Sequence, residues 1–480
     1  MAETKSTSTT ASEIRAKVGH PIVDGDAHVL ESALTLLDYI KQVGGPGIAR
    51  RYETMDSPWK YHDVKSIFWG MPSGPNSLDR ATAMLPKLFR ERLDEGGIDV
   101  SVVYSTAILP LMHVRDDELR QVGHRALNTM LADIFSEVGD RLIPSAGIPM
   151  FSPDEALTEL DYAINELGFK AATFGTEVRL APPEIEANAP ELGKYTERVY
   201  PVALDALYDY DPVWQRCLDL KIPVACHTAA RAGGSRHSSP TNFVFNHLGG
   251  FSTSGDYFCR NIFLDGVTRR FPGLNFAFLE GGVGWAAQLY NDLFEHWEKR
   301  NLDFMKKNLD PAKLDLDLLS ELAEKYGGGI ITPDAIREDM KINTMGGFTA
   351  DDIEIDEFKR CKIKEKKDIY GLFVEPFYFG CEADDAMNAV AFNSNLNHYG
   401  AKLKAFFGSD IGHWDVEDMT HCVPSAYKNI EKGLFSEQDF QDFMFTNPVA
   451  FFARQNPEFF TGTVIENDVR KLLDTQSEAA

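Results

Sequence analysis

The feature that most constrains the fold is a series of short apolar segments, each followed by a turn and then by a segment of helical periodicity. Eight such segments are candidate strands: 21–26, 97–106, 141–149, 169–175, 222–227, 275–280, 377–382 and 403–410. Ser152-Pro-Asp-Glu, after the third segment, is a typical helix start with a serine cap, an early proline and acidic residues. Alternating strands and helices predict a parallel α/β sheet, and eight strands favour a (β/α)8 TIM barrel over an open sheet.

Two intervals are too long for this repeat and predict helical insertions into one barrel domain. The first, at about 33–90, predicts an excursion over one end of the barrel. It contains Pro, Gly and the aromatic residues Tyr52, Trp59, Tyr61 and Trp69. The second, at about 300–370, combines many Lys, Asp and Glu residues with helical spacing. We expect it to form a lid or a subunit contact.

The two ends of the sequence are expected to lie outside the barrel. Residues 1–18 are polar and rich in Ser and Thr, without the apolar segment of a signal peptide, and predict a disordered leader. The barrel domain is expected over 19–460. Residues 461–480 are expected to be a C-terminal tail, disordered from residue 475 onward.

Charge and cysteine usage narrow the class of protein. The net charge is −25, from 73 acidic and 48 basic residues, which argues against binding to nucleic acid or to anionic membranes. No segment approaches the ~18 consecutive apolar residues that a membrane span requires. The six cysteines include no C-x-x-C pair, so a structural zinc or iron–sulfur site is not expected. We therefore expect a cytoplasmic protein with reduced thiols that acts on a small molecule.

Metal-ligand residues recur where the predicted strands end. Asp26 and His28 lie at the end of the first strand with i, i+2 spacing, so their side chains leave the strand on the same face. His227 ends the fifth strand, Glu280 the sixth and Asp410 the eighth. One such residue is usually a turn or a helix cap, but the repetition is not explained in that way. Because catalytic groups of a barrel lie at the carboxyl ends of its strands, the set predicts a site for a divalent cation.

Several residues near these strand ends are candidates for substrate binding. Arg231 and Arg236 follow His227 in a loop, where a guanidinium could hold a carboxylate or an oxyanion. His413 and Trp414 follow Asp410 and are expected to line the pocket or to contact the ligands. The two arginines could equally be charges in a solvated loop.

Two further residues are expected to act next to the ligands. His247, in Asn-His-Leu-Gly-Gly, lies on a predicted helix after the fifth strand and is a candidate catalytic residue. Glu31, beyond His28, is expected to direct the His28 imidazole as a supporting carboxylate.

Four motifs resemble those of the metal-dependent hydrolases of the amidohydrolase superfamily. They are Asp24-Gly-Asp-Ala-His-Val-Leu-Glu, Ile222-Pro-Val-Ala-Cys-His, Leu279-Glu-Gly-Gly-Val-Gly-Trp and Phe407-Gly-Ser-Asp-Ile-Gly-His-Trp-Asp. The most similar branch is the amidohydrolase-2 group, which includes aminocarboxymuconate semialdehyde decarboxylase and γ-resorcylate decarboxylase. The resemblance covers most of the chain except the two insertions and both termini.

The resemblance implies a distorted barrel with one divalent metal ion. The implied ligands are Asp26, His28, His227 and Asp410, and Asp410 would also exchange a proton with metal-bound water. Zinc is the expected ion, with manganese(II) and iron(II) as alternatives. Two positions depart from the family pattern: Asp26 stands where His or Glu is commoner, and Glu280 stands where a histidine usually acts as acid or base.

These residues lead us to expect a metal-dependent hydrolase that cleaves an amide, ester, lactone or activated C–C bond. Glu280 is suited to activating water, and the acidic ligands make the pocket less hospitable to a carboxylate substrate. The aromatic residues of 33–90 suggest an aromatic or bulky apolar substrate. The alternative is a nonoxidative decarboxylase of an aromatic or unsaturated acid, and a second alternative is a non-catalytic barrel with a vestigial metal site. A homodimer is expected.

Overall fold

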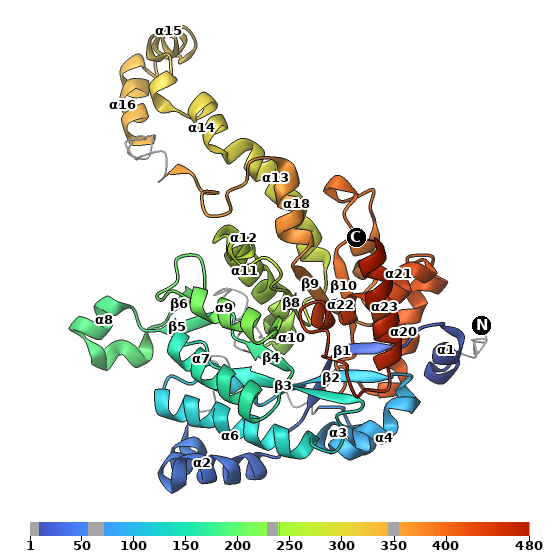
Figure 1. Ribbon diagram of the computed structural model, residues 1–480. Coiled ribbons are helices and arrows are strands. Elements are labelled where there is room, and N and C mark those ends of the chain that lie inside the picture. The colour runs from blue at the N-terminus through green and yellow to red at the C-terminus, as the bar shows by residue number, and fades with distance from the viewer. Residues whose placement is uncertain (1–8, 56–71, 228–238, 240, 344–354, 480) are drawn as a thin grey trace.

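The structure is a computed structural model that describes residues 9–55, 72–227, 239, 241–343 and 355–479. Eight parallel strands form one sheet in the order β1-β2-β3-β4-β7-β8-β9-β10 (Figure 1). Each strand overlaps one of the eight predicted segments, with β1 extending three residues beyond its segment, and the predicted (β/α)8 TIM barrel with helical insertions is confirmed. The strands are β1 (Val23–Val29), β2 (Val100–Ser105), β3 (Leu142–Ile148), β4 (Ala171–Phe174), β7 (Val224–Cys226), β8 (Phe276–Phe278), β9 (Phe377–Glu382) and β10 (Lys404–Gly408).

The barrel closes between its first and last strands, β1 and β10, at their carboxyl ends. The Asp410 N–H donates to the Asp26 carbonyl at 2.9 Å, and the His28 N–H donates to the Ile411 carbonyl at 3.0 Å. Gly408 permits this close approach, because a Cβ atom there would lie 2.9 Å from the Cβ of Asp26. Closure therefore brings the ligand residues of the first and eighth strands together.

Helices surround the strands, and their starts follow local sequence rules. Ser152 accepts a hydrogen bond from the Glu155 N–H and begins α7, as the sequence predicts. Apolar residues between helices and strands, such as Trp214, Phe258 and Phe276, are fully buried. The helices that follow strands are α5 (Ile108–Leu111), α6 (Asp117–Phe135), α7 (Pro153–Asp161), α8 (Pro183–Asn188), α9 (Asp211–Asp219), α10 (Phe243–His247), α11 (Gly250–Leu264), α12 (Val267–Arg270), α13 (Gly284–Arg300), α18 (Lys366–Val374), α19 (Ala389–Phe392), α20 (Cys422–Glu431), α21 (Glu437–Gln441) and α22 (Asn447–Ala453).

The first insertion forms helices beside the barrel. Its described parts are α2 (Ala33–Thr54), α3 (Ser77–Met84) and α4 (Pro86–Gly96). α2 packs against α6, and Ile40 on α2 is fully buried. Of the four aromatic residues singled out in the sequence, Tyr52 is partly buried against the core, and Trp59, Tyr61 and Trp69 lie outside the described residues.

The second insertion is an arm that extends away from the barrel (Figure 1). It consists of α14 (Leu302–Asn308), α15 (Leu316–Tyr326) and α16 (Pro333–Asn343). α13 and α18 pack together at its base. The arm thus confirms the predicted helical insertion, and it extends beyond the helices that surround the barrel strands.

Both ends of the described chain are more ordered than the sequence suggests. α1 (Ala11–Lys17) is a helix within the expected leader, because Thr10 and Glu13 form a capping box and Ile14 is buried. α23 (Glu466–Ala479) occupies the expected tail, and Val469 joins a core cluster beneath the barrel interior. Residues 11–17 and 466–479 are thus helical, whereas the sequence predicts disorder over 1–18 and from 475 onward; burial of Ile14 and Val469 accounts for the order of the two helices.

One element has no counterpart in the sequence-based prediction. β5 (Glu177–Leu180) and β6 (Arg198–Pro201) form an antiparallel hairpin that contains α8 in its connection. Both strands are only four residues long, and the interval between them is too long to give a hairpin signal in the sequence.

Two of the exclusions drawn from composition can be compared with the structure. In the described part of the chain, no helix combines the length and apolarity needed to cross a membrane. All six cysteines are buried and free.

Candidate metal centre

Five ionisable side chains converge at the carboxyl ends of four strands. Asp26 and His28 lie within β1, and His227 directly follows β7. Glu280 and Asp410 lie two residues beyond β8 and β10. Each of the five side chains is no more than 6% exposed. The structure therefore brings together all four predicted ligands and the predicted catalytic carboxylate.

Two of these residues have an unusual backbone conformation. Glu280 has φ +56° and Asp410 has φ +53°, in the left-handed region that non-glycine residues rarely occupy. Such conformations cost on the order of 1 kcal/mol or more and persist where the surrounding structure imposes them. Here they occur immediately after two barrel strands, where the chain turns and each carboxylate enters the shared site.

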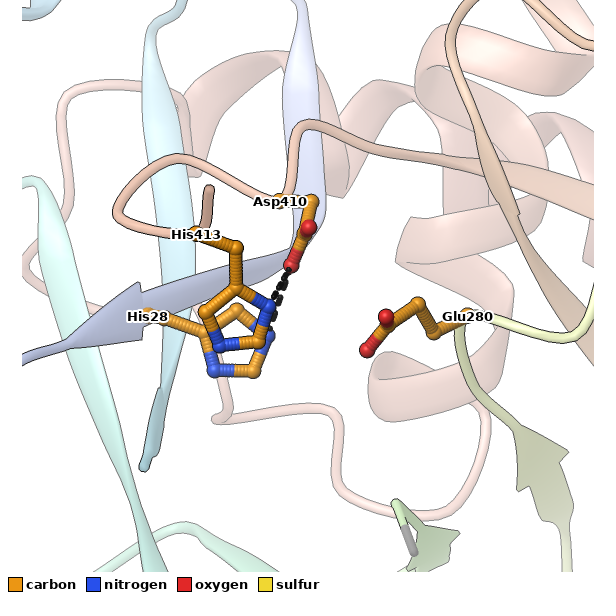
Figure 2. A group of neighbouring side chains, drawn as sticks. All are labelled: His28, Glu280, Asp410 and His413. Atoms are coloured by element: carbon orange, nitrogen blue, oxygen red, sulfur yellow. Dashed lines mark ion pairs between the residues drawn. The ribbon is translucent and has the colours of Figure 1, made fainter. Parts of the chain in front are cut away.

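The donor atoms lie within a few ångströms of one another. The Nε2 atoms of His28 and His227 are 3.1 Å apart, and Asp26 Oδ1 lies 3.6 Å and 3.5 Å from them. Asp410 Oδ1 is 3.1 Å from His28 Nε2, and Glu280 Oε2 is 3.2 Å from His227 Nε2. Figure 2 shows Glu280 on the opposite side of the site from His28, Asp410 and His413.

The donor set fits a divalent cation. Asp26 Oδ1, Glu280 Oε2 and Asp410 Oδ2 are buried and make no hydrogen bond. Buried carboxylate oxygens without partners are costly, and a cation would compensate them. Two groups of donor residues have the separations expected around an ion, and both include His28. One group is Asp26, His28 and His227. The other is His28, Glu280, Asp410 and His413. Carboxylate oxygens and imidazole nitrogens are ligands for zinc and manganese.

The pKa values of the buried side chains also fit a cation-binding site. Burial raises the pKa of Asp26 well above its usual range, and burial together with the charge of Asp410 raises the pKa of Glu280. Burial also lowers the pKa of His28 to about 3 and lowers the pKa of His227. Neutral imidazoles are ready to bind a metal ion, and a divalent charge would favour the ionised form of the ligand Asp26, whereas Glu280 is not one of the four predicted ligands.

His413 pairs with Asp410 and stacks on His28. Its Nδ1 lies 2.6 Å from Asp410 Oδ1, and the two imidazole rings are 3.7 Å apart. Burial opposes ionisation of both partners, but their mutual attraction prevails. The attraction raises the pKa of His413 to about 9. Together with a hydrogen bond from His28, it lowers the pKa of Asp410. The expected position of His413 beside the ligands thus has a defined geometry.

A carboxylate that the sequence analysis did not single out supports the closure of the site. Asp24 accepts hydrogen bonds from the Ser409 N–H at 2.9 Å, the Ser409 hydroxyl at 2.7 Å and the Ser101 hydroxyl at 3.0 Å. It therefore connects β1 and β2 to the turn that carries Asp410. β1 shifts register between Asp24 and Ala27, so the spacing from Asp26 does not place the two side chains on one face, and the sequence gives no signal for this contact.

A second missed carboxylate lies next to the site. Glu382 ends β9 and lines a cavity of about 240 Å³ together with Asp410 and Asp415. Burial and the charge of Asp410 raise the pKa of Glu382 to about 8. Glu382 also ends the predicted seventh strand, so the rule that found Glu280 and Asp410 would have found it.

Aromatic residues form one wall beside His227. The Phe251 and His227 rings are in edge contact, with a centroid distance of 5.4 Å. The ring centroids of His247 and Phe251 are 6.1 Å apart. Trp414 lies 5.5 Å from His247, and Phe243 contacts both rings. The structure therefore brings His247 and Trp414 together in this wall, separated from His227 by Phe251.

Three residues that the sequence suggests for the site are not among the contacts described above. Arg231 and Arg236 lie outside the described residues. Glu31 accepts a hydrogen bond from the Ala107 N–H at 3.0 Å, and His28 Nδ1 has no hydrogen-bond partner. The expected contact between Glu31 and the His28 imidazole does not form, because the carboxylate turns toward the backbone after β2.

Comparisons with known proteins agree with this architecture. The family model described as Amidohydrolase matches residues 94–322. No curated protein matches the chain.

Several solved structures share the fold at low sequence identity. A dihydroxybenzoic acid decarboxylase from Polaromonas sp. JS666, with bound manganese and 2-nitroresorcinol, has a TM-score of 0.52 and 15% identity, covering 92% of this chain and 99% of its own. A 2,6-dihydroxybenzoate decarboxylase from Rhizobium has a TM-score of 0.50 and 15% identity, covering 90% and 98%. An amidohydrolase from Mycobacterium avium subsp. paratuberculosis K-10 has a TM-score of 0.50 and 16% identity, covering 91% and 98%. At these identities the likeness concerns the fold.

Proposed function

Because the Amidohydrolase family model matches residues 94–322 of this barrel, we propose that the chain is a metal-dependent, nonoxidative decarboxylase of the amidohydrolase superfamily that acts on an aromatic or unsaturated carboxylic acid. The observation that carries the proposal is the position of Glu280. This buried acid faces His28 and Asp410 from across the site, and its Oε2 makes no hydrogen bond. The shared fold with two dihydroxybenzoate decarboxylases supports decarboxylation over the hydrolysis that we expected from sequence.

Asp26, His28, His227 and Asp410 would hold the metal ion. When bound, the ion supplies positive charge that attracts the carboxylate and a neighbouring oxygen of the substrate. Zinc was the expectation from sequence, whereas the manganese in the Polaromonas structure supports manganese as the first ion to test. The residues present are compatible with either ion.

Glu280 is the proposed proton donor. Burial keeps its carboxyl group protonated, so it can deliver a proton to the ring carbon that bears the carboxylate. The bond between that carbon and the carboxylate carbon then breaks, CO₂ leaves, and the bonding electron pair restores the ring. Glu280 ends as a carboxylate and regains a proton from solvent before the next cycle.

The other side chains position and shield the reacting groups. His413 holds Asp410 through its Nδ1, which fixes one carboxylate against the His28 imidazole. Phe251 and His247 present an aromatic wall on the His227 side, where a flat ring could pack. Burial of the ionisable groups excludes water and strengthens each charge interaction.

Hydrolysis is the second candidate, and one observation favours it. Asp410 is paired with His413 and remains ionised, so it could accept a proton from water instead of serving only as a ligand. In that reaction Glu280 would act as a base, with its proton already lost to solvent. The two candidates therefore differ in the protonation state that Glu280 needs.

The test compares CO₂ release with hydrolysis by the same preparation. The full chain, loaded with Mn²⁺ or Zn²⁺, is incubated with 2,6-dihydroxybenzoate and a panel of other aromatic acids, and separately with aryl esters, amides and lactones. We expect CO₂ in stoichiometric amounts with the acid consumed, and none from Asp410→Asn. Hydrolysis of the esters, amides or lactones without CO₂ from any acid would refute the proposal in favour of the second candidate. Loss of both activities in a metal-loaded chain would instead favour a vestigial site.

A further inference from the structure

The far end of the arm carries an apolar stripe that is exposed among the residues that the structure describes. On α15, Leu318, Leu322 and Tyr326 are 50%, 43% and 70% exposed. Their i, i+4, i+8 spacing places them on one side of the helix. The buried residue of α15 is Ala323, and α15 packs against α16. α15 therefore has two apolar sides, of which α16 covers one.

Further exposed apolar residues lie in the sequence just beyond both ends of α15. Leu314 precedes the helix, and Ile330 and Ile331 follow it, all at least 45% exposed. We call these six residues the outer stripe: Leu314, Leu318, Leu322, Tyr326, Ile330 and Ile331. Figure 1 shows that α15 lies at the end of the arm farthest from the barrel strands. A patch of this kind on an extended arm is typical of a binding surface.

The arm also lacks the burial that short helices need. α15 and α16 are eleven residues each, and helices shorter than about 12–15 residues are marginal in water without tertiary packing. Contact with α16 buries one side of α15, so a partner on the outer stripe would supply the missing packing. The arm is thus expected to be most stable when that stripe is covered.

We propose that the partner is a second copy of this chain, which pairs through α15 in antiparallel orientation about a twofold axis at Leu322. The spacing of the outer stripe is symmetric about that residue. Leu318 and Tyr326 lie four residues on either side, so each Leu318 would meet Tyr326 of the second copy. A twofold contact of this type uses the same surface on both chains.

Charge beside the outer stripe supports the same arrangement. Glu321 and Lys325 lie one turn apart on the same flank of α15. In an antiparallel pair, equivalent flanks meet, so Glu321 of each copy lies beside Lys325 of the other. An anionic membrane is disfavoured as the partner, because most charges along α15 are acidic: Asp317, Glu321 and Glu324, against Lys325.

The area is sufficient for a substantial part of a dimer interface. Six exposed or half-exposed side chains of this size present on the order of 500 Å² of apolar surface. Specific dimers bury roughly 800 Å² per partner, and the polar residues that flank the stripe would supply the remainder. The proposal concerns assembly and does not depend on the reaction at the metal centre.

The first test is the oligomeric state of the full chain, measured by sedimentation velocity at tens of micromolar. We expect a dimer for the wild type and a monomer for Leu322→Glu. Leu34→Glu is the matched control, because Leu34 is a 75% exposed leucine on α2, and it should remain dimeric. Far-UV circular dichroism should show that both variants keep the barrel's helix and strand content, with any loss of helix in Leu322→Glu limited to the arm. A monomeric wild type, or a dimer that Leu322→Glu leaves intact, would overturn the proposal.

A second test locates the axis directly. The six native cysteines are buried, so they should not interfere with a cysteine introduced at the surface. Leu322→Cys should form a disulfide-linked dimer under mild oxidation, whereas Leu34→Cys should not. Cross-linking that is equal at the two positions, or absent at Leu322 in a preparation that is otherwise dimeric, would place the contact elsewhere and contradict the proposed pairing.

Discussion

The imidazole of His413 lies parallel to the imidazole of His28 at a centroid distance of 3.7 Å, and both rings direct a nitrogen to the same oxygen of Asp410. His28 would bind the metal ion, whereas His413 is not one of the four proposed ligands and contacts two of them, Asp410 and His28. This arrangement makes His413 a positioning residue in our account. Histidines and carboxylates that orient ligands affect metal affinity without binding the ion themselves.

Replacement of His413 by Asn should weaken metal binding and leave the fold intact. Asn cannot carry the charge that holds Asp410, so we expect metal affinity to fall roughly 10- to 100-fold. Competition with a fluorescent chelator measures this affinity. His421→Asn is the control, because the His421 side chain is 73% exposed and lies outside the donor groups. Equal affinities for the two variants would show that His413 does not position Asp410.

Replacement of Glu280 by Gln should remove catalysis while keeping the metal ion. Gln has nearly the same shape but no acidic proton, and loss of a general acid typically lowers kcat by about 10² to 10⁴. Initial rates of CO₂ release, together with metal content, distinguish the two effects. A Glu280→Gln variant with normal kcat and one bound ion would exclude Glu280 as the proton donor.

Replacement of Gly408 by Ala should disturb the site through the barrel backbone. The added Cβ would lie 2.9 Å from the Cβ of Asp26, so Asp26 must move. We expect a loss of about 1–3 kcal/mol in unfolding free energy, as is typical of overpacking, together with weaker metal binding.

Gly139→Ala is the matched control for this variant, because a Cβ atom at Gly139 meets nothing within 4 Å. Urea denaturation measures the unfolding free energy, and a chelator competition measures the affinity. If Gly408→Ala matched Gly139→Ala in both measurements, the close approach of β1 and β10 would not matter for the site.

Acidification should destabilise the protein through His124, which lies on α6 away from the metal centre. Burial lowers the pKa of His124 to about 4, below its ordinary value of 6.5. The unfolded chain therefore binds the proton first, and the stability contributed by neutral His124 is complete above pH ~6.5 and is lost as the pH falls toward 4. We expect His124 to account for about 2 kcal/mol of destabilisation between pH ~7 and pH ~4.5.

The comparison for His124 uses the His124→Leu variant, which cannot titrate at this position. Its unfolding free energy should fall less between the two pH values than that of the wild type. Parallel pH profiles for the two proteins would mean that His124 is not held in its neutral form.

Much of the barrel and of the metal centre is predictable from sequence. Each barrel strand is a short apolar run, and ligand-type residues follow several of these runs, so Asp26, His227 and Asp410 can be placed together without coordinates. That prediction depends on one geometric rule, namely that carboxyl ends of parallel barrel strands meet at one face.

Other features depend on contacts between distant segments, which leave no local signal. Ile14 stabilises α1 only through burial against the barrel, so the surrounding polar sequence resembles a disordered leader. Glu31 lies three residues after His28 in the sequence, which suggests a contact between them. In the structure its carboxylate instead accepts a hydrogen bond from the Ala107 N–H. The choice of partner for such a side chain is decided by tertiary structure.

The most direct test of the central claim is the metal content of the purified full chain after incubation with Mn²⁺ or Zn²⁺ and removal of free ion. Inductively coupled plasma mass spectrometry should find one ion per wild-type chain and almost none in His227→Ala, whose missing imidazole faces His28 and Glu280. The melting temperature of the wild type should rise on loading, since an ion at about 100 times its Kd adds about 2.7 kcal/mol. A wild-type chain that retains no ion and whose melting temperature ignores both metals would contradict the account.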